Sequence, residues 1–453
     1  MDIQKAKEIV VEAGKQLVTS GLIARTWGNV SCRVDSETFV ITPSGRAYET
    51  LTPEEVVLVK IADCSYEGDI KPSSEKGIHA NCYLLRPECN FVIHTHQKNA
   101  SIVSALGCDI NSISGEAKEI IGDNIPVSNY GLSGTGTLKK NVVKALERSD
   151  SKAVIMKNHG AVCLGKDYDD AFAVANAVED VCEQYVFERY ATLTGKIASS
   201  FKDVYDYVAD VKKRSEIPAT PVKAYDSSRE GNVMVLKDKE GADVATIALH
   251  KEMLILGDKI PSEADMHMAI YRGREDINYI IHSEEDAIVS ASKVVKKKLK
   301  PLIDDFAQIA GVTIANVEFD PNNTLKTSKK VVKALGKTKT VALIRDNGAV
   351  CCGKNQDEAE ASEMVADKNC QTFVSTKLFG KAKYVGAVDA LLENVVYRLK
   401  YSKQKYVAKR HCSRWRGHPT PAIKINNNLP YSPCSSVGCI FMLNAKCIKQ
   451  NCV

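Results

Sequence analysis

The sequence has no long hydrophobic run and little net charge. No stretch approaches the roughly 20 apolar residues that span a bilayer, so no membrane-spanning helix is predicted. The formal net charge is only +5 over 453 residues, which argues against a nucleic-acid or anionic-membrane partner. The start, MDIQKAKEIVVEAGKQL, is an amphipathic helical pattern without the basic-then-apolar order of a signal peptide. We therefore expect a cytoplasmic protein.

The chain has 15 cysteines, but their contexts do not indicate disulfides. Ten are scattered through residues 32–370, most of them in apolar settings such as GAVCLG and GAVCCG, where buried free thiols are expected. The other five fall in the last 42 residues. Residues 401–453 mix Cys, Asn, Pro and Ser without periodicity and are predicted to be an irregular tail. A metal knuckle in this tail is the alternative, although its Cys and His spacing fits no standard zinc pattern.

One domain occurs twice in the sequence. A constant shift of 188 residues aligns Ser74 with Ser262, Glu75 with Glu263 and NHGAVCLGK with DNGAVCCGK. Since 453 residues exceed one ordinary core, two domains are expected in any case. We predict a first domain over 1–205, a linker over 206–224 and a second domain over 225–400.

Helical and strand patterns alternate within the first copy, which predicts an α/β layered domain. Helical periods cover residues 6–21, 75–87, 139–148 and 168–193. Strand patterns cover residues 30–34, 38–43, 90–96 and 152–160.

Three histidines end predicted strands. His94 and His96 would point to the same face of a strand, because side chains alternate with period two. A His-X-His pair alone is more often an exposed pair than a metal site. His159, however, also ends an apolar strand, in VIMKNHGAV. Three histidines with an open fourth position are a catalytic zinc arrangement.

Turns rich in hydroxyl and amide groups surround these histidines in the sequence. KPSSE places Ser73 and Ser74 near a helix start, where free N–H groups favour an anion such as phosphate. TWGNVS (26–31) and TPSG (42–45) are two further turns of this kind, each of which alone would be a common turn. Glu75 alone would be a first-turn glutamate that complements the helix dipole.

Five motifs together make the first copy resemble the class II aldolase/adducin family. GLIARTWGNVS, ITPSG, KPSSE, HTH and NHG stand in the family's order and spacing. The resemblance implies a three-layer α/β/α domain with a mostly antiparallel sheet, present twice. It implies that His94, His96 and His159 bind zinc or another divalent metal and that Glu75 is the acid/base. It also implies a phosphate site formed by Thr26, Asn29, Ser44, Gly45, Ser73 and Ser74.

Within the family, the likeness is greatest to the branch that cleaves L-fuculose 1-phosphate. It implies reversible cleavage of a ketose 1-phosphate to dihydroxyacetone phosphate and a small aldehyde. Glu75 would move the proton of the C4 hydroxyl, provided that burial raises its pKa toward neutrality. The alternatives are a sugar-phosphate 4-epimerase, which typically carries Asp where this chain has Glu75, and a methylthioribulose-phosphate dehydratase. The tyrosine acid of the aldolases has no counterpart in SISGEAKEIIGDN.

The second copy lacks most of these groups. The 188-residue shift keeps His94 as His282, but it replaces His96 with Glu284 and His159 with Asn347. TPSG has no counterpart, so we predict that the second copy is non-catalytic. It would be an assembly partner in a homo-oligomer, such as a pseudo-tetramer of two chains in which it completes the first copy's site. A wholly non-catalytic, adducin-like scaffold is the remaining alternative.

Overall fold

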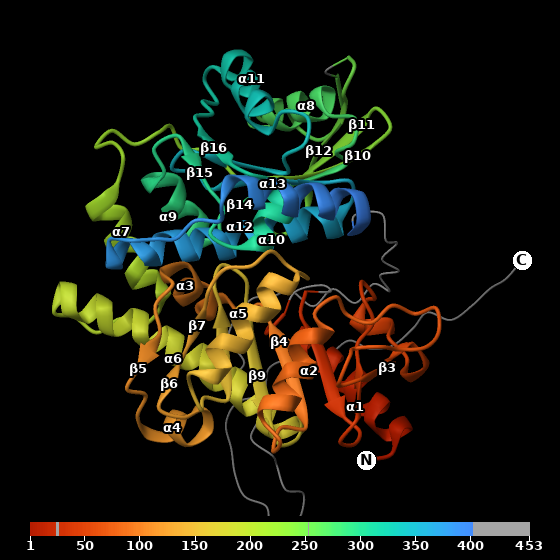
Figure 1. The fold of residues 1–453 in the computed structure, drawn as a ribbon. Coiled ribbons are helices and arrows are strands. Elements are labelled where there is room, and N and C mark those ends of the chain that lie inside the picture. Colours follow the sequence, from red (N-terminus) through yellow and green to blue (C-terminus); the bar gives the residue numbers. More distant parts are fainter. Residues whose placement is uncertain (24–26, 252, 402–453) are drawn as a thin grey trace, which may run out of the picture. The chain divides into compact units, whose positions relative to one another are not determined.

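The first copy is built on a seven-stranded sheet with the order β3-β2-β1-β4-β9-β8-β7 (Figure 1). The computed structural model describes residues 1–23, 27–251 and 253–401. All neighbouring strands of this sheet are antiparallel except the pair β7–β8. The strands are β1 Asn29–Arg33, β2 Thr38–Ile41, β3 Val57–Lys60, β4 Phe91–Thr95, β7 Val127–Ser128, β8 Ala153–Met156 and β9 Ala161–Gly165.

Helices cover both faces of the first sheet, because both faces are apolar. In β4, Phe91 and Ile93 belong to one buried cluster and Val92 to another, as the alternation of strand side chains requires. One cluster is completed by α1 Ile3–Thr19, α3 Lys98–Leu106, α4 Gly115–Ile121 and α6 Tyr168–Thr194. The other is completed by α2 Lys76–Leu85 and α5 Gly136–Glu147. Smaller elements are η1 Tyr48–Thr50, η2 Pro53–Glu55, β5 Ile110–Asn111 and β6 Asn124–Ile125.

The second copy repeats this architecture on a nine-stranded sheet with a single parallel pair, β16–β17. Its strands are β10 Asp226–Glu230, β11 Val233–Lys237, β12 Asp243–Ala248, β13 Met253–Leu256, β14 Tyr279–Ser283, β15 Lys298–Leu299, β16 Ile314–Val317, β17 Val341–Ile344 and β18 Ala349–Gly353. One face packs on α8 Ala264–Gly273 and α11 Thr324–Leu335. The other packs on α7 Phe201–Lys212, α9 Asp286–Val294, α10 Asp304–Ala310 and α12 Gln356–Thr376. The copy ends with η3 Lys377–Phe379, α13 Ala387–Val396 and the π-helical turn η4 Tyr397–Tyr401.

The strand register confirms the duplication. His94 of β4 is paired with Val162 of β9, and His282 of β14 is paired with Val350 of β18. Both pairs are related by the same shift of 188 residues that the sequence showed. The predicted three-layer α/β/α fold with a mostly antiparallel sheet is therefore confirmed in both copies.

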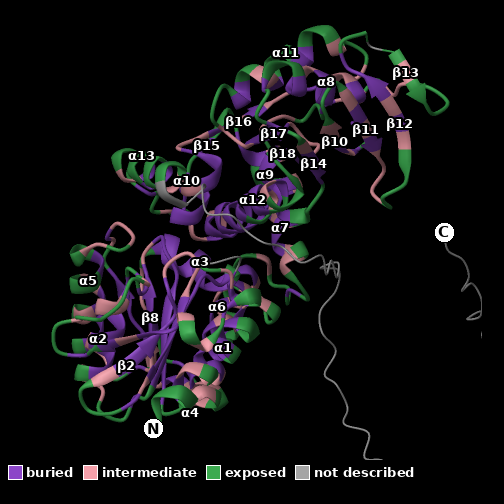
Figure 2. Cartoon of the chain, turned by 90° about the vertical axis from the view of Figure 1, so that its right-hand side faces the viewer, coloured by how far each residue is buried: buried purple, intermediate pink, exposed green. Residues whose placement is uncertain are grey.

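The two copies share one buried cluster, and Figure 2 colours all buried residues of the chain purple. Ile102 of α3 and Val186 of α6 lie in the same cluster as Val374 of α12. The linker was expected to start at 206, but α7 runs through this position as a helix and its Val204 joins the shared cluster. The domain boundaries themselves remain predictions, and residues 402–453 of the expected tail lie outside the described part of the chain.

A buried serine–histidine pair recurs in the two copies. His79 Nδ1 lies 2.6 Å from Ser31 Oγ, and His267 Nδ1 lies 2.7 Å from Ser227 Oγ. Burial lowers the pKa of both histidines to about 3. They are neutral core residues in the folded chain.

Because the pKa values of these two histidines are lowered in the fold, we predict that the protein loses stability in mild acid. They are protonated in the unfolded chain below their ordinary pKa of 6.5 but stay neutral in the fold down to about pH 3. Their contribution is therefore complete above pH 6.5 and is lost as the pH falls. Each accounts for a loss on the order of 2 kcal/mol between pH 7 and pH 5. Urea unfolding at pH 7 and pH 5 should show a smaller decrease in the free energy of unfolding for His267→Asn than for the parent protein. Equal decreases in the two proteins would contradict this account.

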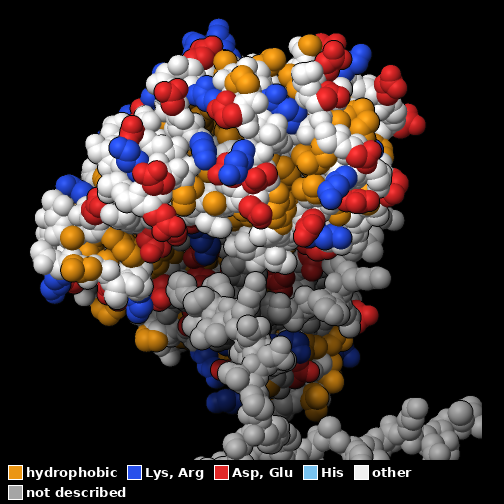
Figure 3. Space-filling view, turned by 90° about the horizontal axis from the view of Figure 1, so that it is seen from below, with side chains coloured by type: hydrophobic (Ala, Val, Ile, Leu, Met, Phe, Trp, Pro, Cys, Tyr) orange, Lys and Arg blue, Asp and Glu red, His pale blue; other side chains and the backbone are white. Residues whose placement is uncertain are grey.

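The surface carries both signs of charge. Figure 3 shows acidic and basic side chains interspersed over the visible face, in keeping with the small net charge. Among the described helices, none has the length and apolar character needed to cross a membrane. Of the cysteines in the described residues, all but Cys64 and Cys108 are buried, as the sequence predicted.

Candidate metal centre

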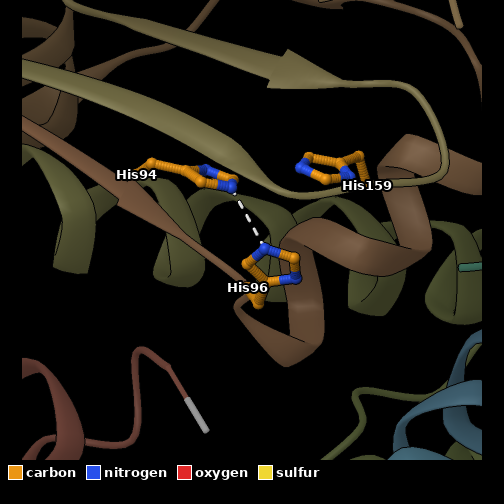
Figure 4. A group of neighbouring side chains, drawn as sticks. All are labelled: His94, His96 and His159. Atoms are coloured by element: carbon orange, nitrogen blue, oxygen red, sulfur yellow. Dashed lines mark hydrogen bonds between the residues drawn. The ribbon is translucent and has the colours of Figure 1, made fainter. Parts of the chain in front are cut away.

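Three buried histidines of the first copy converge at one end of its sheet (Figure 4). His94 lies in β4, and His159 lies in the turn between β8 and β9. The strand β4 ends at Thr95, so His96 lies in the short connection between β4 and α3. The prediction that His96 belongs to the strand was wrong. The ligand nitrogens of the three rings lie within 4.8 Å of one another. The ring centroids are 4.7 to 5.0 Å apart.

The hydrogen-bond partners of the rings leave their Nε2 atoms facing one another. His94 Nδ1 donates to the carbonyl oxygen of Ala161 at 2.9 Å, so its neutral ring carries a lone pair on Nε2. His96 Nε2 lies 3.0 Å from this atom. His159 Nε2 is buried and lies 3.2 Å from Glu75 Oε1. Three buried imidazoles with converging Nε2 atoms suit a divalent metal such as zinc, and this group of three could hold one.

Glu75 lies directly beside this group. Its Oε1 is 3.2 Å from His159 Nε2, and its Oε2 is 3.3 Å from His94 Nε2. Asn29 donates to Oε2 at 3.0 Å. Glu75 occupies the position before α2, but its side chain does not cap that helix. The interpretation of Glu75 as a residue that serves the helix dipole is therefore not needed, because its carboxylate faces the histidines.

The pKa of Glu75 differs from what the sequence led us to expect. Burial raises the pKa of Glu75, but the neighbouring His94 and His159 rings and the hydrogen bond from Asn29 lower it by more, so that it lies well below the usual range. The expectation that burial brings this pKa toward neutrality is wrong in this arrangement. Glu75 is a carboxylate and can accept a proton.

The loops expected to hold phosphate lie side by side. Pro43 and Pro72 form an isolated β-bridge, and Ser44 N donates to the carbonyl oxygen of Lys71 at 2.9 Å. In this antiparallel register Ser44 lies opposite Lys71, and Ser73 N donates to the carbonyl oxygen of Thr42 at 3.0 Å. Ser73 is buried, and its hydroxyl accepts from Glu75 N at 3.2 Å, whereas Ser74 is exposed. The side chain of Asn29 forms hydrogen bonds with Glu75 and His79. Thr26 lies outside the described residues.

The absence of a side chain at Gly160 of the NHG motif lets this turn lie close to Thr95 and His94. A Cβ at this position would lie 2.1 Å from the carbonyl oxygen of Thr95 and 2.9 Å from His94 Cε1. We expect Gly160→Ala to lower stability by about 1–3 kcal/mol and to weaken zinc binding by displacing His94. Gly136→Ala is the matched control, because a Cβ there meets nothing within 4 Å. Thermal unfolding and zinc titration of both variants check this, and equal behaviour would contradict it.

Two acidic residues of the second copy also reach the histidines. Asp304 Oδ2 lies 3.1 Å from His159 Nδ1, and Asp305 Oδ2 lies 3.6 Å from His96 Nδ1. Sequence reasoning missed both residues. The available signal was a pair of adjacent acids in the apolar context PLIDDFAQ, where buried acids are rare unless they are paired.

The aligned positions of the second copy do not form a similar group. His282 Nε2 donates to the carbonyl oxygen of Asn347 at 2.7 Å, and Glu284 is exposed. The side chain of Asn347 bonds the backbone of Thr220 and Val222. Among the described residues, His94, His96 and His159 are the single group of three or more candidate ligands. The second copy is degenerate at this place.

Several known proteins resemble this chain over less than half of its length. The 5-deoxy-D-ribulose 1-phosphate aldolase of Bacillus thuringiensis is 32% identical over 189 residues, which cover 42% of this chain and 87% of that protein. A 5-methylthioribulose-1-phosphate/5-deoxyribulose-1-phosphate aldolase of Escherichia coli is 33% identical over 186 residues, covering 41% of this chain and 85% of that protein. A solved structure titled L-fuculose 1-phosphate aldolase is 28% identical and covers 43% of this chain and 89% of its own, with a TM-score of 0.39.

The family itself is matched in both copies. The family described as "Class II Aldolase and Adducin N-terminal domain" matches residues 8–186 and again residues 223–374. These two segments correspond to the two sheets of the structure. The chain therefore belongs to the class II aldolase and adducin family.

Proposed function

We propose that the first copy is a zinc-dependent aldolase, which reversibly cleaves a ketose 1-phosphate to dihydroxyacetone phosphate and a small aldehyde. The observation that carries the proposal is the contact of Glu75 with His94 and His159 inside the buried three-histidine group. A base next to three candidate metal ligands is what such a cleavage requires. The relatives named above are sugar-phosphate aldolases that match over the first half of this chain.

Each part of the site has a role in this proposal. His94, His96 and His159 hold the zinc, which when bound supplies Lewis-acid stabilisation of the negative charge left on the cleaved ketose. The Glu75 carboxylate accepts the proton of the C4 hydroxyl. Ser44, Gly45, Ser73 and Ser74, with Thr26 and Asn29, orient the phosphate, so that the C3–C4 bond lies at the reacting groups.

The general acid that completes the reaction is not the tyrosine used by other aldolases of the family. Residues 111–124 contain no tyrosine. Tyr130 lies nearby, but its hydroxyl donates to Asp304 at 3.1 Å, and burial and Asp304 raise its pKa far above the ordinary value. We assign the acid to no residue.

The substrate assay separates the alternatives. The purified chain is incubated with 5-deoxyribulose 1-phosphate and with L-fuculose 1-phosphate, and dihydroxyacetone phosphate is measured with a coupled dehydrogenase. Release of dihydroxyacetone phosphate supports the aldolase. An epimerised sugar phosphate or a dehydrated methylthioribulose phosphate, without cleavage, would replace the aldolase by one of the two alternatives. No bound zinc and no turnover would leave the adducin-like scaffold.

The assembly remains part of the proposal. A homo-oligomer in which two chains form a pseudo-tetramer would give a particle of about twice the 49.6 kDa chain mass. A measured mass of one chain or of four chains would count against it.

A further inference from the structure

The second copy sets two fully buried carboxylates against the histidines of the first copy. Asp304 and Asp305 open α10 and have no exposed side-chain surface. Both face an Nδ1 atom, at 3.1 Å for His159 and at 3.6 Å for His96. The third ring, His94, has its Nδ1 on a carbonyl oxygen of its own copy. His94 and His159 therefore have a hydrogen-bond acceptor at Nδ1, and the acceptor of His159 comes from the second copy. Asp305 of the second copy faces His96 Nδ1 from 3.6 Å, beyond hydrogen-bond distance.

This arrangement matters because a histidine binds a metal with one nitrogen. An acceptor at Nδ1 keeps the proton there, leaves the Nε2 lone pair free and fixes the plane of the ring. A carboxylate in this place also makes the imidazole a stronger donor. Asp304 and Asp305 thus lie behind two of the three rings whose Nε2 atoms converge in the first copy, those of His159 and His96.

The two acids are themselves held in place. Asp304 accepts hydrogen bonds from Tyr130 Oη at 3.1 Å and from Ser133 Oγ at 3.4 Å. Asp305 forms an ion pair with the buried Lys368 of α12, which also donates to the carbonyl oxygen of His96 at 3.1 Å. Burying carboxylates is costly. Such a built environment, in a copy that has lost its own metal ligands, indicates a role at the neighbouring site.

We infer that Asp304 and Asp305 are positioning residues of the metal site, so that the first copy reaches its full metal affinity only with the second copy in place. This inference rests on the proposed function, because it assumes that the three histidines bind zinc. It gives the degenerate copy a specific task, which is to orient His159 and His96.

The experiment measures zinc affinity of the full chain by competition with a chelator of known affinity. The variants are Asp304→Asn and the double variant Asp305→Asn with Lys368→Met, which leaves no buried charge unpaired. We expect a loss of about 10–100-fold in zinc affinity for each, and a changed visible spectrum of the cobalt-loaded protein. Asp367→Asn is the matched control, because Asp367 is also a buried acid of the second copy that pairs with the first copy, through Lys98 at 2.6 Å.

The outcomes are distinct. Reduced affinity and an altered cobalt spectrum in the two test variants, with the parent values in Asp367→Asn, support the inference. Parent zinc affinity in all variants overturns it and leaves the aldolase proposal intact. Should Asp304→Asn not fold, Asp304→Glu keeps a carboxylate one methylene away and is expected to bind zinc with intermediate affinity, while parent affinity would overturn the role of Asp304. A parent protein that binds no zinc would instead remove the proposed function.

Discussion

Replacement of Glu75 by glutamine is expected to reduce kcat for the cleavage of a ketose 1-phosphate by roughly 10²–10⁴-fold. Glutamine has nearly the same shape and keeps a hydrogen-bond acceptor for Asn29, but it cannot accept the proton of the C4 hydroxyl. Zinc content should stay close to that of the parent protein, since the three histidines remain. The measurement is steady-state release of dihydroxyacetone phosphate, together with metal analysis of the same samples.

Glu263→Gln is the control for this experiment. Glu263 is the residue of the second copy aligned with Glu75. It lies before α8, where its Oε1 accepts from Lys223 N at 3.4 Å. Within the described part of the chain, the single three-histidine group is the one beside Glu75. We expect unchanged kcat in this variant. Equal activity losses in the two variants, or full activity in Glu75→Gln, would contradict the assignment of the base to the first copy.

Replacement of Lys368 by methionine is expected to lower the free energy of unfolding by about 3–5 kcal/mol. Lys368 is buried and forms an ion pair with Asp305, whose side chain has no exposed surface. Burial by itself raises the pKa of Asp305, but Lys368 and His96 lower it below the ordinary value. Removal of Lys368 leaves this carboxylate buried beside His96 without its main counter-charge. Urea unfolding in the presence of a chelator measures the change without a contribution from zinc.

Lys98→Met provides the comparison for this second prediction. Lys98 also forms an ion pair between the copies, with Asp367, but about half of its side chain is exposed. Such a pair contributes about 0–1 kcal/mol. We expect most of the lost stability to return in Lys368→Met with Asp305→Asn, because this double variant carries neither charge. A loss of similar size in Lys98→Met and Lys368→Met would contradict the account.

The sequence predicted the duplicated fold and the three histidines, because both depend on local signals. Apolar runs and a shift of 188 residues identify β4, β8 and their counterparts in the second copy, whereas β9 was not predicted as a strand. Motifs at the ends of these strands then predict convergence, since neighbouring strands bring their ends together. The exact ends of elements were less predictable. His96 lies just beyond the end of β4, and α7 continues past residue 206, where the linker was expected to start.

The part of the site contributed by the second copy could not be predicted. Asp304 contacts His159, which lies 145 positions earlier in the chain, and Lys368 donates to His96 across 272 positions. These contacts depend on how the two copies pack through α3, α10 and α12, and no periodicity in the sequence reports that packing. The prediction that the pKa of Glu75 is raised toward neutrality was wrong for a related reason. Burial can be inferred from an apolar context, but the charges that surround a buried group cannot.

The most direct test of the account is the zinc content of the full chain, measured by plasma mass spectrometry after purification without added metal. Our account predicts about one zinc ion per chain, because the first copy has three converging histidines and the aligned positions of the second copy do not converge. It also predicts loss of that zinc in His96→Ala. Two zinc ions per chain, or a single ion that His96→Ala retains, would contradict a metal centre formed by His94, His96 and His159.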